Sequence, residues 1–131
     1  MIAPAAPHRA VKPSALPSSL ERVVTCAHLA SDNKARDILV LDMRGLTPLY
    51  DYLLLATAAG KRQMHAIAEE IDAKLQNLGD QRLGQEGYES CKWIVQDFGD
   101  VVVHIMDPLS REYYALENLW ADAPRVSWEK M

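Results

Sequence analysis

The chain has 131 residues, of which 49% are hydrophobic and 24% charged, a composition typical of one packed globular domain rather than of a disordered chain. Its formal net charge of −4 argues against nucleic acid as the primary ligand, because proteins that grip the phosphate backbone usually carry a basic excess. No apolar run approaches the ~20 residues that cross a bilayer, and two cysteines cannot build a disulfide framework, so we expect a cytoplasmic protein with no membrane contact.

The predicted N-terminal arm covers residues 1–18. Four of the seven prolines fall in the first 17 residues, where they prevent a helix and stand among small side chains that bury little apolar surface. An organellar transit peptide would also be basic, but the prolines spoil the amphipathic helix that it needs, so an organellar location is the weaker interpretation. We therefore divide the chain into a flexible arm, a domain at residues 19–123 and a short tail at residues 124–131.

A helix and two strands are predicted next. Ser18 and Glu21 have the spacing of a capping box, which starts a helix that we expect to run from about Ser19 to about Ala30. Two short, branched, apolar runs then predict strands over residues 37–43 and 50–57. The second run is apolar almost throughout, so we expect both of its faces to be covered.

The longest predicted helix follows these strands. Its apolar residues keep a 3.6-residue period from Met64 to Leu78, and Gly79 follows at the position of a helix C-cap. Residues 80–90 contain glycines and little hydrophobic pattern, so they leave room for at most one short strand.

The C-terminal half is predicted to hold a hairpin and one more helix. Two branched runs at residues 92–97 and 101–106 are joined by a short link with a glycine, which favours an antiparallel hairpin. Pro108 suits the first turn of a last helix. We expect this helix to carry four large apolar or aromatic side chains: Leu109, Tyr113, Leu116 and Leu119. The order of elements predicts an α/β fold with a mixed β-sheet covered by helices.

An acidic rim is the strongest candidate for catalysis. Asp97, Asp100 and Asp107 bracket the last two strands, and carboxylates at strand ends hold magnesium in two-metal phosphoryl-transfer enzymes. The chain has no glycine-rich phosphate loop and no Asp-x-Asp pair to place two carboxylates on one face of a strand. A magnesium-dependent nucleotidyltransferase is therefore kept as the alternative function.

The cysteines and histidines give no metal-binding pattern. Cys26 and His28 are two residues apart on a predicted helix and point to different faces. Cys91 is isolated, and the four histidines share no spacing of the kind that zinc sites use. We expect no metal and no cofactor.

The stretch at residues 93–120 is the most unusual part of the chain, because it holds five of the nine aromatic residues. Strand alternation there places His104 on the face of Val102, opposite Val101, Val103 and Ile105. The aromatics either fill the core or form a protein–protein hot spot, since tryptophan, tyrosine and arginine dominate such hot spots. Residue patterns alone leave both interpretations open.

Four segments of the chain carry a family resemblance: VLDMRGLTPLYDYLLLAT, RQMHAIAEEI, EGYESCKWIVQDFGDVVVHIM and REYYALENLWADA. Their order and spacing, above all WxxxDFGDVVVH followed by RxYYxLExLW, resemble the Iojap-like family of ribosomal silencing factors. The resemblance covers about residues 20–123, and the arm and the last eight residues lie outside it.

The resemblance implies a translational repressor and no enzyme. Such a protein binds the large ribosomal subunit through its protein L fourteen and sterically blocks joining with the small subunit, with ribosomal RNA at most a peripheral neighbour. It also implies a fold distantly similar to nucleotidyltransferases and a homodimer when the protein is free. A homodimeric regulator with another protein partner is the remaining interpretation of the same surface.

Nine residues in the C-terminal half are the candidate partner-binding site. The acidic members are expected to pair with basic groups on the ribosomal protein, and Trp93, Phe98, Tyr113 and His104 are the candidates for direct contact. Val101, Val103, Ile105, Leu116 and Leu119 are expected in the core. The full candidate set is Trp93, Asp97, Phe98, Gly99, Asp100, His104, Arg111, Tyr113 and Tyr114.

Overall fold

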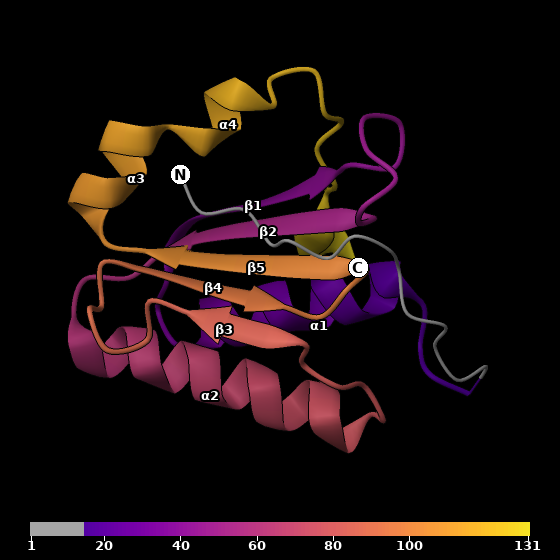
Figure 1. Cartoon of the computed structure of the whole chain (residues 1–131), viewed down its shortest axis with the longest axis horizontal. Coiled ribbons are helices and arrows are strands. Elements are labelled where there is room, and N and C mark those ends of the chain that lie inside the picture. Colours follow the sequence, from indigo (N-terminus) through magenta and orange to yellow (C-terminus); the bar gives the residue numbers. More distant parts are fainter. Residues whose placement is uncertain (1–14) are drawn as a thin grey trace.

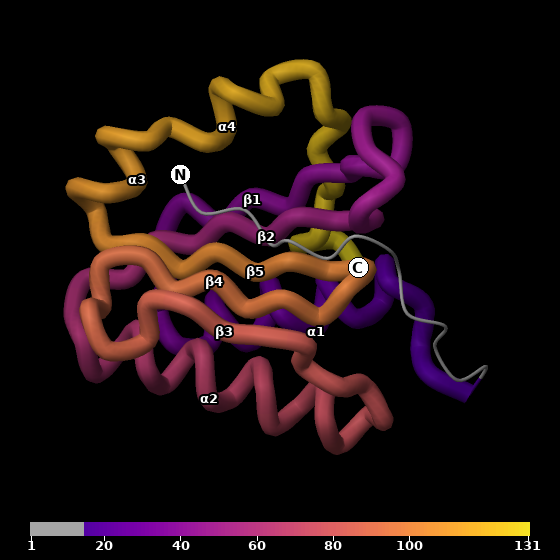
Figure 2. The backbone as a smooth tube through the Cα atoms, in the orientation of Figure 1, coloured from indigo at the N-terminus to yellow at the C-terminus, as the bar shows by residue number. Residues whose placement is uncertain are grey.

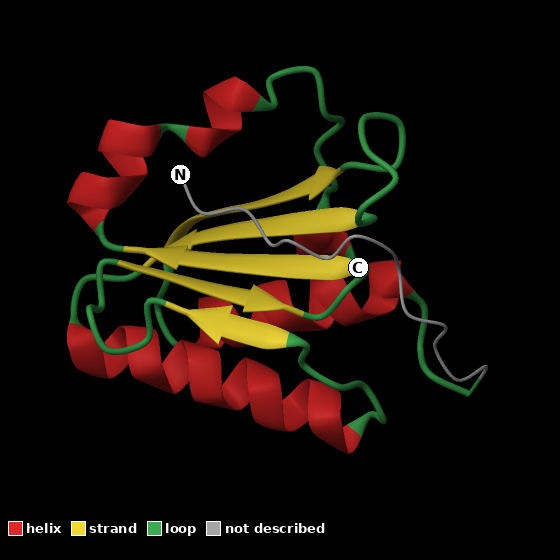
Figure 3. Cartoon of the chain, viewed as in Figure 1, coloured by secondary structure: helices red, strands yellow, loops and turns green. Residues whose placement is uncertain are grey.

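A mixed five-stranded sheet forms the centre of the protein in the computed structural model, which describes residues 15–131. The sheet runs in the order β1-β2-β5-β4-β3, with β2 and β5 parallel and all other neighbours antiparallel (Figure 3). The strands are β1 (Arg36–Asp42), β2 (Tyr52–Thr57), β3 (Gly84–Glu86), β4 (Trp93–Asp97) and β5 (Val101–Met106). The predicted α/β class, the mixed sheet and the antiparallel β4–β5 hairpin are confirmed.

Most of the predicted arm, residues 1–14, lies outside the described residues. The division into arm, domain and tail therefore stays a prediction, as does the likeness to nucleotidyltransferases.

Two long helices cover one face of the sheet (Figure 1). They are α1 (Ser19–Asp32) and α2 (Lys61–Asn77). The predicted cap of α1 is confirmed, because the Glu21 amide donates to Ser18 Oγ at 3.1 Å. Just beyond α2, Gly79 has a φ of +101°, a backbone conformation that favours glycine.

The segment that follows β5 packs on the opposite face of the sheet, where Leu116 and Ala123 join the buried cluster of Leu53 and Val102. Two short helices, α3 (Pro108–Tyr114) and α4 (Leu116–Leu119), follow β5 on this side. All six residues of β2 are buried, which confirms that both of its faces are covered. The alternation along β5 is also confirmed, since Val101, Val103 and Ile105 belong to the core under α1 and α2, whereas Val102 faces the other side.

The sequence predicted a single C-terminal helix, and this prediction is wrong, because the structure has the two short helices α3 and α4 instead. Ala115 has a φ of +46° and ψ of 51°, a left-handed conformation that ends α3 and starts α4 in a new direction. The break changes which side chains face the core. Leu116 is buried as expected, but Leu119 is 58% exposed and does not belong to the core.

The last eight residues close the outer edge of β1. The Asp42 amide donates to the Pro124 carbonyl at 2.8 Å, and the Val126 amide donates to the Val40 carbonyl at 2.9 Å. Trp128 then packs into the core beside α1, at the start of the 3-10 turn η1 (Trp128–Lys130). In Figure 2 the yellow tube follows this path from α4 back to β1.

Candidate functional site

Helix α3 is fixed to the end of the sheet by polar contacts at its start and middle. The Asp107 amide donates to the Lys92 carbonyl at 2.9 Å, and the Asp107 carboxylate accepts the Ser110 amide at 2.7 Å as the N-cap. Arg111 is buried, and its guanidinium donates to Thr57 Oγ1 at 3.0 Å and to a Glu117 carboxylate oxygen at 3.1 Å. The helix is therefore held in one orientation before any partner binds.

A row of four aromatic rings leads from the sheet through α3 to the surface. Trp93 lies beside His104, its ring is 4.6 Å from the Tyr114 ring, and that ring is 4.9 Å from the Tyr113 ring in an edge-to-face arrangement. Exposure rises along the row from 2% for His104 and 7% for Trp93 to 43% for Tyr114 and 82% for Tyr113. The exposed tyrosines thus stand on a buried, packed support.

His104 is neutral at the buried end of this row. Burial lowers the pKa of His104 to about 3, because a cationic imidazole loses its hydration there. Trp93 Nε1–H donates to His104 Nδ1 at 2.8 Å, which places the remaining ring proton on Nε2. The pair orients the Trp93 ring, and through it the tyrosines that pack above.

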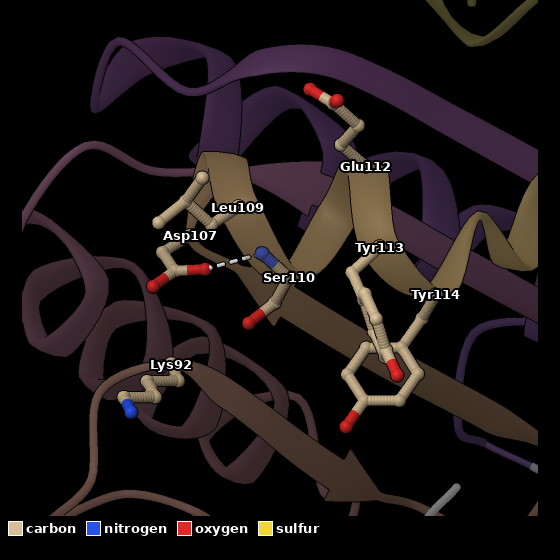
Figure 4. Close-up of a pocket in the computed structure, with 7 residues that line it drawn as sticks. All are labelled: Lys92, Asp107, Leu109, Ser110, Glu112, Tyr113 and Tyr114. Atoms are coloured by element: carbon tan, nitrogen blue, oxygen red, sulfur yellow. Dashed lines mark hydrogen bonds between the residues drawn. The ribbon is translucent and has the colours of Figure 1, made fainter.

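A groove of about 520 Å³ opens beside the exposed rings, as Figure 4 shows. Lys92, which directly precedes β4, stands on one side of the groove and the two tyrosines on the other. Leu109 and Tyr113 are the most exposed apolar side chains of this region, and they lie one helical turn apart. We call Leu109, Tyr113 and Tyr114 the α3 patch.

Two acidic side chains, Asp107 and Glu112, line the groove beside the α3 patch. Arg111 is buried and paired with Glu117, which leaves Lys92 as the basic side chain of the groove lining. The surface suits a partner with basic side chains around an apolar contact.

The structure separates the predicted site residues into two groups at opposite ends of β5. Trp93, His104, Arg111, Tyr113 and Tyr114 gather at the end where α3 begins. The remaining four form or flank the β4–β5 turn, roughly 17 Å away along a six-residue strand. These four are Asp97, Phe98, Gly99 and Asp100.

Residues of the β4–β5 turn have structural partners. Phe98 is only 1% exposed and packs in the core under α1 and α2. Trp93 and His104 are buried as well, so the expectation of direct contact is wrong for three of its four candidates, and Tyr113 alone among the four is exposed. The Asp97 carboxylate accepts the Gly99 amide at 2.8 Å, and Gly99 has a φ of +89°. The sequence pattern could not predict the burial of Phe98, because the path of a turn over the helices depends on tertiary packing.

The acidic rim does not form a metal-binding cluster among residues 15–131. Asp100 is held by both terminal nitrogens of Arg22, and Asp107 caps α3. Asp97 is engaged with the turn, at the other end of β5 from Asp107. The three carboxylates proposed for a nucleotidyltransferase therefore do not converge on one site, and the geometry gives that alternative no support.

Sequence reasoning missed Lys92, Leu109 and Glu112 as members of the groove lining. A signal was present for Leu109, which stands four residues before Tyr113 and so shares its helix face. Lys92 had no such signal, because only the pairing of β4 with β5 brings it beside α3.

Comparison with known proteins shows which family has this architecture. A family model described as "Ribosomal silencing factor during starvation" matches residues 16–131. The chain belongs to this family, RsfS. The match includes the last eight residues, which corrects the expectation that the likeness ends near residue 123, and it agrees with their packing against β1.

Individual RsfS proteins and a solved structure agree with this assignment. The ribosomal silencing factor RsfS of Halalkalibacterium halodurans is 37% identical over 112 residues, covering 86% of this chain and 96% of that protein. A crystal structure of a Chromobacterium violaceum protein has a TM-score of 0.77 and 38% identity, covering 80% of this chain and 88% of that one. A mouse relative, "Mitochondrial assembly of ribosomal large subunit protein 1", is 32% identical over 95 residues, covering 70% of this chain and 42% of that protein.

RsfS membership gives the chain a ribosome-associated role in silencing translation. It is thus assigned to a family of regulatory proteins, some of whose relatives are named as chloroplast or mitochondrial proteins. Within residues 15–131 none of the helices has the length and apolar character needed to span a membrane.

Proposed function

We propose that this protein silences translation by binding the large ribosomal subunit through the α3 patch. The bound protein would sterically block the small subunit from joining. Family membership supports the ribosomal role, and the name of the mouse relative points to the large subunit. The observation that carries the proposal is the pair of exposed tyrosines on a helix whose base is buried and hydrogen-bonded.

The α3 patch has the properties of a protein-binding hot spot. Tyrosine is enriched at hot spots because it offers a large apolar ring and a polar tip for little loss of side-chain freedom. Tyr114 packs on Trp93, so much of the ordering that binding would require is already present in the free protein. An apolar centre with a polar rim is the usual anatomy of a protein–protein interface.

Charge favours a basic protein as the direct contact. The chain has a net charge of −4, and acidic residues flank the α3 patch. A basic ribosomal protein such as L fourteen fits this surface, and ribosomal RNA would be repelled from it and stay peripheral. Steric exclusion of the small subunit needs no chemistry from the bound factor.

Binding is tested by co-sedimentation of the full chain with purified large subunits, with small subunits as the control. We expect the wild-type protein to pellet with large subunits. Substitution of Tyr113 by alanine should weaken binding by about 30-fold, equivalent to about 2 kcal/mol for a hot-spot side chain. A wild-type protein that stays in the supernatant at micromolar concentration contradicts the proposal.

A matched pair of leucine variants tests the position of the surface. Leu109→Ala changes the α3 patch, whereas Leu83→Ala changes an exposed leucine beside β3. We expect the first variant to bind large subunits more weakly and the second to bind like wild type. Equal effects of the two substitutions would place the contact elsewhere.

The silencing step is measured separately, by mixing large and small subunits with the protein and separating the particles on a sucrose gradient. Wild-type protein should reduce the joined-ribosome peak, and the Tyr113→Ala variant should leave it closer to the level without protein. Binding without any loss of the joined peak would retain the docking surface and reject steric silencing.

A further inference from the structure

Three exposed leucines line a second pocket, which lies between α4 and the loop that joins β1 to β2. The cavity has a volume of about 350 Å³, and Leu46 and Leu49 line it from the β1–β2 loop, whereas Leu119 lines it from α4. These side chains are 47%, 38% and 58% exposed. Clustered apolar side chains left open to water are typical of surfaces that a partner covers. We call this cavity the leucine pocket.

Backbone hydrogen bonds fix both walls of the leucine pocket. In the β1–β2 loop, the Leu46 amide donates to the Met43 carbonyl at 3.0 Å, and in the C-terminal segment the Trp120 amide donates to the Leu116 carbonyl at 3.2 Å. Met43 and Leu116 are themselves buried in the cluster on this face of the sheet. A side chain that enters the leucine pocket therefore meets walls that are already ordered, which lowers the entropy cost of binding.

The exposed apolar surface of the protein is concentrated at two places. Eight large apolar side chains are exposed within residues 15–131: three form the α3 patch, three line the leucine pocket, and Leu83 and Met131 are the other two. The three side chains of the α3 patch are few for a specific interface, to which each partner contributes roughly 20–30 residues. A stable complex therefore has to cover more surface than the α3 patch.

One partner of ordinary size can reach both places. Tyr113 lies in α3 and Leu119 in α4, and Ala115 alone separates the two helices. Six residues span at most about 20 Å even when fully extended, whereas an interface of about 800 Å² per partner is about 30 Å across. Figure 1 shows α3, α4 and the β1–β2 loop along one margin of the molecule.

The charge at the leucine pocket is negative. Asp122 is exposed and lines the pocket, and it takes part in none of the ion pairs found within residues 15–131. Arg44 lines the adjoining groove, but it is paired with Asp42 at 2.8 Å. A partner with a basic side chain next to an apolar one matches this arrangement, and a phosphate backbone does not.

We propose that the leucine pocket is a second anchor site for the same basic protein of the large ribosomal subunit that binds the α3 patch, an inference that rests on the proposed function. The partner inserts one bulky apolar side chain between Leu46 and Leu119 and places a lysine or arginine beside Asp122. Two separate anchors fix the orientation of the bound protein, which steric exclusion of the small subunit requires.

Two truncations test the anchor by co-sedimentation with large subunits. Leu46→Ala and Leu119→Ala should each weaken binding about tenfold, whereas Leu83→Ala should bind like wild type. Circular dichroism and thermal melting verify that each variant is folded. If Tyr113→Ala weakens binding but both pocket variants bind like wild type, the second anchor is rejected and the proposed function stands. A wild-type protein that does not pellet rejects both.

A charge reversal tests the basic side chain on the partner. Asp122→Lys should weaken binding about tenfold, mainly by slowing association. Glu129→Lys is the matched control, because Glu129 is an exposed acid in η1 and lies in neither binding surface. Equal effects of the two reversals would reflect net charge alone and would overturn the proposed contact at Asp122.

Photo-crosslinking identifies what occupies the leucine pocket. A benzophenone amino acid is placed at position 46 in one variant and at position 113 in another, and each is irradiated in complex with large subunits. We expect mass spectrometry to find the same ribosomal protein attached at both positions. Attachment at position 46 to ribosomal RNA, to a different ribosomal protein or to a second copy of this chain would overturn the proposal.

Discussion

His104 shows at the scale of one residue how burial sets chemistry. Its strand position gives it the same face as Val102, and the segment that follows β5 covers that face. Deprived of water, the ring stays neutral and accepts a hydrogen bond from Trp93. Its role is to position the aromatic row, since its Nδ1 is occupied by the hydrogen bond from Trp93.

The shifted pKa of His104 makes stability depend on pH. An unfolded chain protonates this histidine below about pH 6.5, whereas burial keeps the folded pKa near 3. Because the unfolded state binds the extra proton, stability is fully present above pH 6.5 and falls as the pH drops toward 3. Between pH 7 and 5 the loss from this residue is about 2 kcal/mol.

Denaturant unfolding at several pH values checks this expectation. His104→Gln retains an oxygen that can accept from Trp93 but has no titrating ring, so its free energy of unfolding should fall about 2 kcal/mol less over the same range. Parallel pH profiles for the two proteins would show that His104 is not the titrating group.

Residue patterns predicted the face of His104 but not its bonds. Alternation along β5 was enough to place it with Val102, because a strand has a fixed two-residue period. The Trp93 partner was not predictable, since it depends on the register of β4 against β5. The leucine pocket was missed for a similar reason, as it joins the β1–β2 loop to α4.

At the scale of elements, the loop before β4 is locked to its strand by Gly87. This residue has a φ of +79°, and a Cβ built on it would lie 1.9 Å from the Trp93 carbonyl oxygen. Any side chain would push the loop away from β4 at Trp93, which packs between His104 and Tyr114 in the aromatic row. Gly87 thus supports the candidate docking site.

Substitution of Gly87 by alanine should lower the free energy of unfolding by about 2 kcal/mol or more, because the backbone conformation and the close approach both oppose it. Gly45→Ala is the control, since nothing lies within 4 Å of its Cβ position, and its effect should stay within about 0.5 kcal/mol. Chemical denaturation of the two variants measures the difference. Equal free energies of unfolding for the two variants would mean that the loop before β4 can move aside without loss of stability.

The elements with a strong hydrophobic period were predictable from the sequence. The prediction failed for the last helix, which is divided at a residue that gives no turn signal. The helices α1 and α2 and the β4–β5 hairpin follow from hydrophobic spacing and from Ser18 and the glycine link. Ala115 breaks the last helix although alanine favours helices. The break lets Leu116 enter the core, and tertiary packing of this kind overrides local preference.

At the scale of the whole molecule, Arg22 joins three distant parts of the chain. Its guanidinium donates from α1 to Asp80, which follows α2, and to Asp100 in the β4–β5 turn. Burial lowers the pKa of Arg22, but the hydrogen bonds and charges of the two carboxylates outweigh it and hold the pKa above its ordinary value. The partners are 58 and 78 residues away, so no local pattern could reveal them.

Replacing Arg22 by methionine should destabilise the fold by about 3–5 kcal/mol, since it leaves buried carboxylate charge without its partner. The same substitution at Arg82, whose ion pair with Asp72 is about one-third exposed, should cost less than about 1 kcal/mol. Thermal and chemical unfolding of both variants compares the two pairs. Similar losses would indicate that the buried network contributes no more than a surface pair.

The closure of β1 by the last eight residues has a consequence for how a partner can recognise the sheet. Its outer backbone groups are already paired at Asp42 and Val40, so an added strand from another protein would first have to displace residues 124–126. A partner that contacts this edge would therefore bind its side chains rather than pair with its backbone. A peptide competitor designed as a copy of α3 is accordingly a better starting point than one designed as an extended strand.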